Sequence, residues 1–258
     1  PREVEDGPTQ CDEVVSASAV SLASLEEVSR LDDRAGNEVL HGVDLEVAPG
    51  RMLALVGPSG AGKSTIASLI PRLYDVDSGE ITVGGVDVRE LAFADLRGAV
   101  GVVTQDGHLF HDTVRANLLY AAPDASEADL RAAMVRARLG DLLEELPAGL
   151  DTVVGERGHR LSGGERQRLT IARLLLASPR VVILDEATAH LDSESEHAVQ
   201  EALTEALVGR TSVVIAHRLS TVRAADTIAV VEHGRVVEHG THTSLLERGG
   251  RYADLYHT

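Results

Sequence analysis

The sequence predicts an α/β fold, in which parallel strands alternate with helices. Two predominantly apolar runs, 181–184 and 212–216, are typical of strands that are covered on both faces in a parallel sheet. A third apolar run, 52–56, leads directly into a glycine-rich loop of the kind that opens a helix. The 258 residues are sufficient for one large α/β domain with a sizeable core.

The glycine-rich loop, 57–65, has the composition of a phosphate-binding loop. Its glycines allow the backbone to turn its N–H groups inward around a polyphosphate, and the helix that follows adds further unpaired N–H groups. Lys63 is the single lysine of the chain, and a compact ammonium on a flexible stem suits the terminal phosphates better than a planar guanidinium. The Ser64 hydroxyl can ligate a magnesium ion. An ordinary glycine-rich turn is the alternative, but the full motif after a strand favours nucleoside triphosphate chemistry.

Composition excludes several classes of protein. A formal charge of −17 argues against a nucleic-acid surface, because such surfaces need a basic stripe. The one cysteine, Cys11, leaves no intrachain disulfide and suits a reducing compartment. No apolar stretch approaches the roughly 18 residues that span a bilayer. Because the sequence starts at Pro1 with an acidic, turn-rich lead, we expect a piece of a longer polypeptide whose remaining part is membrane-bound.

Patterning along the chain indicates its organisation. Residues 1–22 have the character of a linker, and the strand and helix signals lie within 23–258. Residues 43–47 alternate apolar and polar side chains, and two short runs flank Gly84-Gly85, so we expect an antiparallel sheet beside the nucleotide. Residues 126–146 carry apolar side chains at helical spacings, which predicts a helical insertion there.

Two further motifs carry charged or phosphate-binding groups. Asp185 and Glu186 end a buried strand, where Asp185 would hold magnesium and Glu186 would act on the attacking water. A strand that simply exits into solvent would be the alternative. Ser162 and Glu165 have the spacing of a capping box that starts a helix running through 176, and the two glycines between them would let a phosphate approach closely. A capping box alone is an ordinary structural feature.

In full, these motifs resemble those of the nucleotide-binding domain of ATP-binding cassette (ABC) transporters, from about residue 24 to the C-terminus. In the family's order they are 57–65 (Walker A), Gln105 (Q-loop), 161–165 (signature), 181–186 (Walker B), 189–192 (D-loop) and His217 (switch histidine). The resemblance implies a P-loop NTPase (RecA-like) core with an antiparallel β subdomain and an inserted α-helical subdomain.

The branch of the family is also indicated. Residues 155–158 resemble the exporter-specific X-loop, and 234–241 resemble the corresponding sequence of exporter ATPase domains. The acidic lead 1–8 is similar to the linkers that join an exporter's membrane domain to its ATPase domain. The resemblance therefore implies that the domain hydrolyses ATP to power export. It also implies a location at the cytoplasmic face of the cell membrane and a partner, the transmembrane domain of an exporter.

The family resemblance implies a head-to-tail dimer with a second ABC ATPase domain, from the same or a homologous chain, and ATP and Mg²⁺ as cofactors. The implied nucleotide-binding residues are Gly57, Pro58, Ser59, Gly60, Ala61, Gly62, Lys63, Ser64 and Thr65. Ser162, Gly163 and Gly164 would contact the γ-phosphate in trans, with Asp192 at the shared interface. Ser64, Gln105 and Asp185 would hold the metal. Glu186, His217 and Gln105 would be catalytic, with His217 holding Glu186 in place.

One position departs from the family pattern. The family usually places an aromatic residue before the Walker A strand to stack on adenine, whereas 28–31 contains none. We expect Arg30 to stack on the base or Leu31 to pack against it, which ATP titrations of the two alanine variants would test. Two other functions stay open at this point. One is a soluble non-transport ABC ATPase, and the other is an ATP-binding cassette with little hydrolysis that acts as a regulatory partner.

Overall fold

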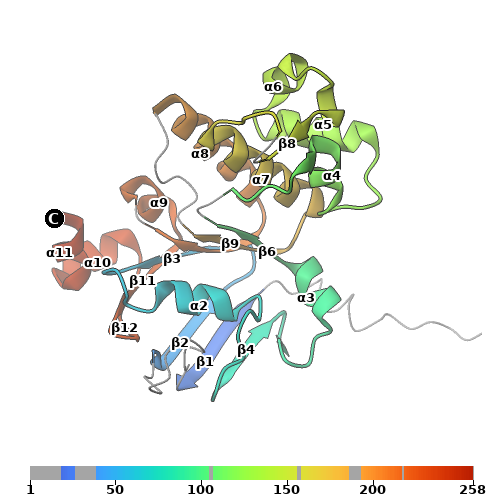
Figure 1. The fold of residues 1–258 in the computed structure, drawn as a ribbon. Coiled ribbons are helices and arrows are strands. Elements are labelled where there is room, and N and C mark those ends of the chain that lie inside the picture. Colours follow the sequence, from blue (N-terminus) through green and yellow to red (C-terminus); the bar gives the residue numbers. More distant parts are fainter. Residues whose placement is uncertain are drawn as a thin grey trace, which may run out of the picture. The chain divides into compact units, whose positions relative to one another are not determined.

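The computed structural model describes residues 19–26, 39–104, 107–155, 158–185, 193–216 and 218–257 (Figure 1). The chain divides into two compact units. We call 1–100, 180–183 and 209–258 the sheet unit, and 101–179 with 184–208 the helical unit. Within the described ranges, no helix combines the length and the apolar character needed to cross a membrane.

An antiparallel sheet forms one part of the sheet unit. Its strand order is β2 (His41–Val47), β1 (Val20–Glu26), β4 (Glu80–Val83) and β5 (Val86–Asp87), and each neighbouring pair is antiparallel. Gly84 and Gly85 have φ of 62° and 81°, the left-handed conformation that a tight hairpin needs. The predicted strand at 43–47 and the predicted hairpin are thereby confirmed. Of the residues that the structure describes, the first to belong to a strand is Val20, at the start of β1.

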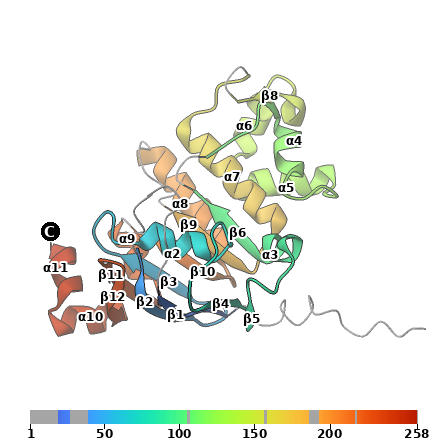
Figure 2. The ribbon, with the colours of Figure 1, turned by 60° about the horizontal axis from the view of Figure 1, so that its bottom comes forward.

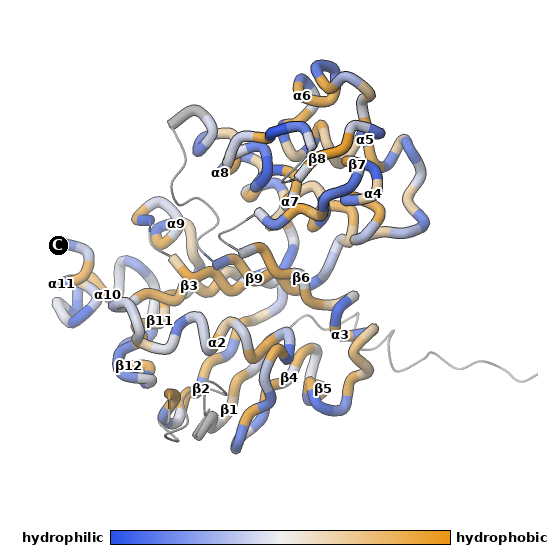
Figure 3. The backbone as a smooth tube through the Cα atoms, in the orientation of Figure 1, coloured by the Kyte–Doolittle hydropathy of each residue, from blue (hydrophilic) through white to orange (hydrophobic). Residues whose placement is uncertain are grey.

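The larger sheet is mixed. Its strand order is β12 (Arg235–Gly240), β11 (Thr227–Glu232), β3 (Met52–Val56), β10 (Thr211–Ile215), β9 (Val181–Asp185) and β6 (Val100–Val103). β10 and β11 both pair with β3 in parallel, and β12 pairs with β11 antiparallel. The strand predicted at 52–56 and the parallel strand predicted at 212–216 are confirmed as β3 and β10, and β3 is hydrophobic along its length (Figure 3).

Strand β3 is covered on both faces, as its apolar sequence predicts. Leu53 and Leu55 belong to a core that includes α2 (Lys63–Leu69) and the inner face of the antiparallel sheet. Ala54 and Val56 point the other way, into a second core with α9 (Leu219–Ala224), α10 (His242–Arg248) and α11 (Arg251–His257). α10 and α11 lie against β12 (Figure 2). The α2 helix therefore lies between the two sheets, and α3 (Phe93–Ala99) follows β5.

The helical unit consists mainly of packed helices. The long helix α7 (Gly163–Ala177) packs against α4 (Val114–Leu119), α5 (Glu127–Arg136) and α8 (Ser193–Leu207). The remaining elements are β7 (Asp112–Thr113), α6 (Gly140–Glu145), the short 3-10 helix η1 (Gly149–Asp151) and β8 (Val153–Val154).

The predicted helical stretch at 126–146 is confirmed, and it consists of two helices, α5 and α6. The break falls at Arg138, whose φ of 57° is left-handed. A non-glycine residue in this conformation interrupts a helix without the glycine that usually marks such an end in a sequence.

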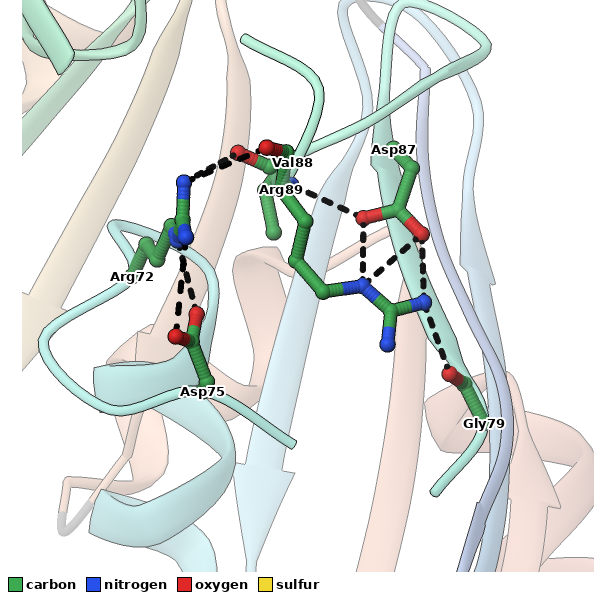
Figure 4. Close-up of polar contacts among 6 residues, drawn as sticks. All are labelled: Arg72, Asp75, Gly79, Asp87, Val88 and Arg89. Carbon is green, nitrogen blue, oxygen red and sulfur yellow. Dashed lines mark hydrogen bonds and ion pairs between the residues drawn. The ribbon is translucent and has the colours of Figure 1, made fainter. Parts of the chain in front are cut away.

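An arginine network fixes the far end of α2 (Figure 4). Arg72, just beyond the helix, has φ of 56°, and its Nε donates to Asp75 Oδ1 at 2.7 Å. Its NH1 donates to the carbonyls of Val88 and Arg89 at 3.5 and 3.3 Å. Because 88–89 follows β5 directly, this guanidinium joins the helix that starts at the phosphate loop to the antiparallel sheet.

A second arginine in the same close-up stabilises the β4–β5 region. The Arg89 guanidinium donates to both carboxylate oxygens of Asp87, the shorter bond being 2.6 Å, and also to the Gly79 carbonyl at 3.1 Å. These side-chain hydrogen bonds hold the pKa of Asp87 below its usual value. A lowered pKa in the folded state means that the ionised carboxylate favours folding.

We expect Asp87→Asn to lower the melting temperature by a few degrees at pH 7. The contribution of Asp87 is complete above its unfolded-state pKa of about 4, and it is lost as the pH falls through the lower folded-state pKa. The difference between the two proteins should therefore shrink toward zero as melts are repeated from pH 7 down to pH 3. The control is Asp124→Asn, an exposed carboxylate before α5. A difference for Asp87→Asn that stays constant with pH would contradict the assignment.

Candidate functional site

The phosphate loop connects β3 to α2, and its shape depends on glycine. Gly57 has φ of 145°, and a Cβ there would lie 2.0 Å from the Val231 carbonyl oxygen of β11. Gly62, at the N-cap of α2, has φ of 106°. Gly60 also has a positive φ, 78°, but no atom within 4 Å of its Cβ position. Gly57 is therefore required by both conformation and space, whereas Gly60 is required by conformation alone.

Neighbouring elements hold the loop in this shape. The Ala61 carbonyl accepts a hydrogen bond from Gly234 N at 2.9 Å, and the Gly234 carbonyl accepts one from His41 N at 2.9 Å. Gly234 lies in the β11–β12 turn, where a Cβ would approach the Val39 carbonyl oxygen to 2.1 Å. The turn between the last two strands and the start of β2 thus brace the phosphate loop from one side.

Lys63 is almost completely buried, with 6% of its surface exposed. Its Nζ donates to the Gly57 and Pro58 carbonyls, each at 2.8 Å. An ammonium places three donors on one atom, so these bonds hold the charge at the inside of the loop. Thr65 is buried, while Ser64 is exposed at the first turn of α2. The structure confirms the strand–loop–helix context that the sequence predicted for this segment.

Two of the expected magnesium ligands are described. Asp185 ends β9 and is half-buried after four buried apolar residues, and Ser64 presents a hydroxyl to solvent. Carboxylate and hydroxyl oxygens are hard donors that suit Mg²⁺, which usually takes few protein ligands together with phosphate oxygens and water. In the described ranges, no cluster of three or more His, Cys, Asp or Glu side chains could hold a metal. The donors therefore fit an ion that arrives with a polyphosphate.

In the helical unit, the predicted capping box at the start of α7 is confirmed. The Ser162 hydroxyl accepts from Glu165 N at 3.2 Å, and a Glu165 carboxylate oxygen accepts from Ser162 N at 2.6 Å. Ser162 and Gly163 are exposed. Gly164 is buried, and a Cβ there would lie 2.7 Å from the Ser195 side chain of α8. The second glycine thus serves helix packing, while the first residues of the motif face solvent.

A link that the sequence analysis missed joins α7 to the segment around Gln105. Gln167 is 3% exposed, and its Nε2 donates to the Thr104 carbonyl at 3.1 Å. A Cβ at Gly107 would meet the Arg166 backbone at 2.9 Å. Both flanks of Gln105–Asp106 are therefore fixed on α7. The sequence did contain a signal for this link. On the inward-facing stripe of α7, formed by Gly164, Gln167, Ile171 and Leu174, Gln167 is the one strongly polar residue.

The other predicted residues lie outside the described part of the chain. They are Arg30, Leu31, Gln105, Glu186, Asp192 and His217. Their roles stay predictions, as do the X-loop at 156–157 and the D-loop.

The model of the family described as "ABC transporter" matches residues 40–189, more than half of the chain. This chain belongs to the ABC transporter family. It is an ATP-binding ABC ATPase domain, and the matched residues run from the start of β2 through the Walker B strand.

Relatives of this ABC domain include an ABC transporter ATP-binding protein and a flippase. An "uncharacterized ABC transporter ATP-binding protein YwjA" of Bacillus subtilis is 48% identical over 220 residues, 85% of this chain and 38% of the relative. An "ATP-dependent lipid A-core flippase" of Chromobacterium violaceum is 46% identical over 253 residues, 97% of this chain and 43% of the relative. The chain thus spans about two fifths of the length of these relatives.

A solved structure gives the same result for the fold of the ABC domain. The "Structure of a bacterial Atm1-family ABC exporter with ATP bound" superposes with a TM-score of 0.85 at 43% identity, covering 99% of this chain and 43% of that one. The predicted α/β P-loop NTPase core with an antiparallel β subdomain is confirmed, and so is the predicted homology to exporter-type ATPase domains.

We expect Gly57→Ala to reduce ATP affinity at least tenfold, because its Cβ would collide with the Val231 carbonyl and displace the loop. Gly60→Ala is the matched control in the same loop, since it meets no atom and incurs only the left-handed penalty of about 1–2 kcal/mol. Titration with a fluorescent ATP analogue, with thermal melts alongside, measures both. Equal effects of the two substitutions would show that space at Gly57 is not limiting.

Proposed function

We propose that this ABC ATPase domain binds ATP with Mg²⁺, closes head-to-tail on a second such domain, and powers the export of a substrate across a membrane. The observation that carries the proposal is the braced phosphate loop with Lys63 at its centre, in a chain whose relatives include exporters. We further propose that the linker covers 1–22, the ATPase domain 23–258, and the helical subdomain about 107–178.

Hydrolysis would use groups from four segments. The N–H groups of the loop wrap the β- and γ-phosphates, and the Lys63 ammonium balances their charge. Glu186 accepts the proton of the attacking water, and His217 contacts the γ-phosphate and keeps Glu186 oriented. Ser64, Asp185 and Gln105 would hold magnesium, which neutralises charge that develops on the phosphate oxygens.

The second domain would complete each site in trans. Ser162 and Gly163 are exposed at the start of α7, where the capping box fixes the backbone N–H groups. An exposed helix N-terminus of fixed geometry suits a phosphate that another chain carries. In this arrangement Gly164 completes the trans contact and Asp192 lies at the shared interface, so two chains form two ATP sites.

A surface of the helical unit supports a transmembrane-domain partner, and with it a location at the cytoplasmic face of the cell membrane. Phe110 and Tyr120 are 44% and 60% exposed, with ring centroids 4.8 Å apart. Arg173 lies 5.3 Å from the Phe110 ring centroid and donates to the His108 and Asn117 carbonyls, so this aromatic pair is held in place. Exposed aromatic side chains on a rigid base are typical of a protein docking site.

We expect Glu186→Gln to leave ATP binding intact and to lower turnover by about 10²–10⁴, the usual contribution of general acid–base catalysis. Lys63→Ala should instead weaken ATP binding itself, because it removes the charge at the loop. Steady-state ATPase assays and equilibrium nucleotide titrations separate the two effects. Near-normal turnover in Glu186→Gln would overturn the assignment of Glu186, and negligible turnover in the unchanged chain would favour the regulatory-partner alternative.

We also expect Glu186→Gln to elute as a dimer in size-exclusion chromatography when Mg-ATP is present, because blocked hydrolysis traps the closed form. Ser162→Arg in the same background should remove the dimer while leaving ATP binding unchanged, since it places bulk at the trans contact. Elution as a monomer, with bound ATP shown separately, would mean that identical chains do not close on their own.

A further inference from the structure

A cavity of about 210 Å³ lies inside the sheet unit, between α11 and the carboxyl ends of β3 and β10. On the sheet side it is lined by Val56, Gly57, Ala216, Arg218, Leu219 and Val222. On the α11 side it is lined by Tyr252, Leu255 and Tyr256. The cavity therefore touches the start of the phosphate loop and both residues that flank His217 in the sequence.

The α11 wall is anchored independently of the nucleotide site. The two carboxylate oxygens of Glu238, on β12, accept hydrogen bonds from Arg251 N at 2.9 Å and Tyr252 N at 2.8 Å. A carboxylate at a helix N-terminus satisfies free N–H groups and favours the helix dipole. The Arg251 guanidinium also pairs with Glu232 on β11. The start of α11 is thus fixed to the last two strands.

Tyr252 connects the anchored start of α11 to the hydrophobic core. Its side chain is 2% exposed and packs in one cluster with Val56, Ala216 and Val222. Its hydroxyl shares a hydrogen bond of 2.7 Å with His242 Nδ1 at the start of α10. One aromatic side chain thus shares a core cluster and a cavity wall with residues at the ends of both strands that lead into the predicted nucleotide-binding segments.

We propose that α11 positions the residues on either side of His217, namely Ala216 and 218–219, and that Tyr252 and Leu255 are positioning residues for ATP hydrolysis. Side chains in a packed interior adopt discrete arrangements, and a cavity beside a segment leaves room for that segment to adopt a second conformation. The anchored wall of α11 limits the arrangements that Ala216, Arg218 and Leu219 can take when a γ-phosphate is present. The inference rests on the proposed contact of His217 with that phosphate.

The chain contains no tryptophan, which makes the cavity directly observable. Leu255→Trp places a single indole at the cavity, and Glu186→Gln in the same chain prevents hydrolysis during the measurement. Glu247→Trp, at an exposed position of α10, is the matched control. We expect the Leu255→Trp emission to change at least twice as much with Mg-ATP as with Mg-ADP, and the Glu247→Trp emission to respond equally to both. Adding His217→Ala should remove the difference at position 255.

A second measurement covers the case in which the indole disrupts folding. Glu238→Gln replaces one acceptor oxygen by an NH₂ group, which cannot accept from a backbone N–H. In the otherwise unchanged chain we expect kcat to fall about threefold to tenfold, while KM for ATP stays within about twofold. A merely structural role would instead lower the melting temperature and leave kcat per folded molecule unchanged.

The outcomes separate this inference from the proposed function. If labelled ATP and ADP both bind, but the Leu255→Trp emission does not distinguish them and Glu238→Gln keeps its kcat, the positioning role is wrong and the ATPase proposal stands. If the unchanged chain neither binds nor hydrolyses ATP, the proposed function itself fails.

Discussion

The fit of Gly57 against the Val231 carbonyl is the constraint on which the nucleotide site depends. A backbone atom of β11 occupies the space that any side chain at position 57 would need, so the shape of the loop depends on the register in which β3 and β11 pair. The turn that follows β11 then reaches the loop a second time, through Gly234 and Ala61. A segment near residue 60 thus acquires its geometry from residues more than 170 positions later.

In each unit, helices are likewise held in place by residues that are distant in the sequence. α2 begins at the phosphate loop, lies between two sheets, and ends at Arg72, which reaches across to the residues after β5. α7 begins at the signature, and Gln167 fixes it to Thr104, 63 residues earlier. α11 is anchored by Glu238. In all three cases a helix next to the predicted chemistry is held by a polar side chain that bonds to backbone atoms, which fixes position as well as favouring burial.

The parts that could be predicted from the sequence have local signals. Strand β3 is uniformly apolar, β10 ends in an apolar run, Gly84-Gly85 marks a hairpin, and Ser162 with Glu165 marks a helix start. Each of these patterns concerns residues within a few positions of one another. The break between α5 and α6 falls at Arg138, which is not a glycine, so the sequence of 126–146 does not show where one helix ends and the next begins. The Arg72 and Glu238 contacts depend on tertiary packing and leave no comparable trace. Among the site residues, the structure places the Walker A loop, Asp185 and the signature start, while the roles of Glu186, Gln105 and His217 still rest on their place in the motif order.

The burial of Lys63 has a consequence for the chemical reactivity of the protein. Every other strong side-chain cation is an arginine, so the chain carries one ε-amine. Only 6% of the surface of this lysine is exposed. Reagents that acylate or alkylate side-chain amines have one lysine to find, at the inside of the phosphate loop, with two carbonyls already holding its protons. The covalent reactivity of this protein toward such reagents is therefore a property of its nucleotide site.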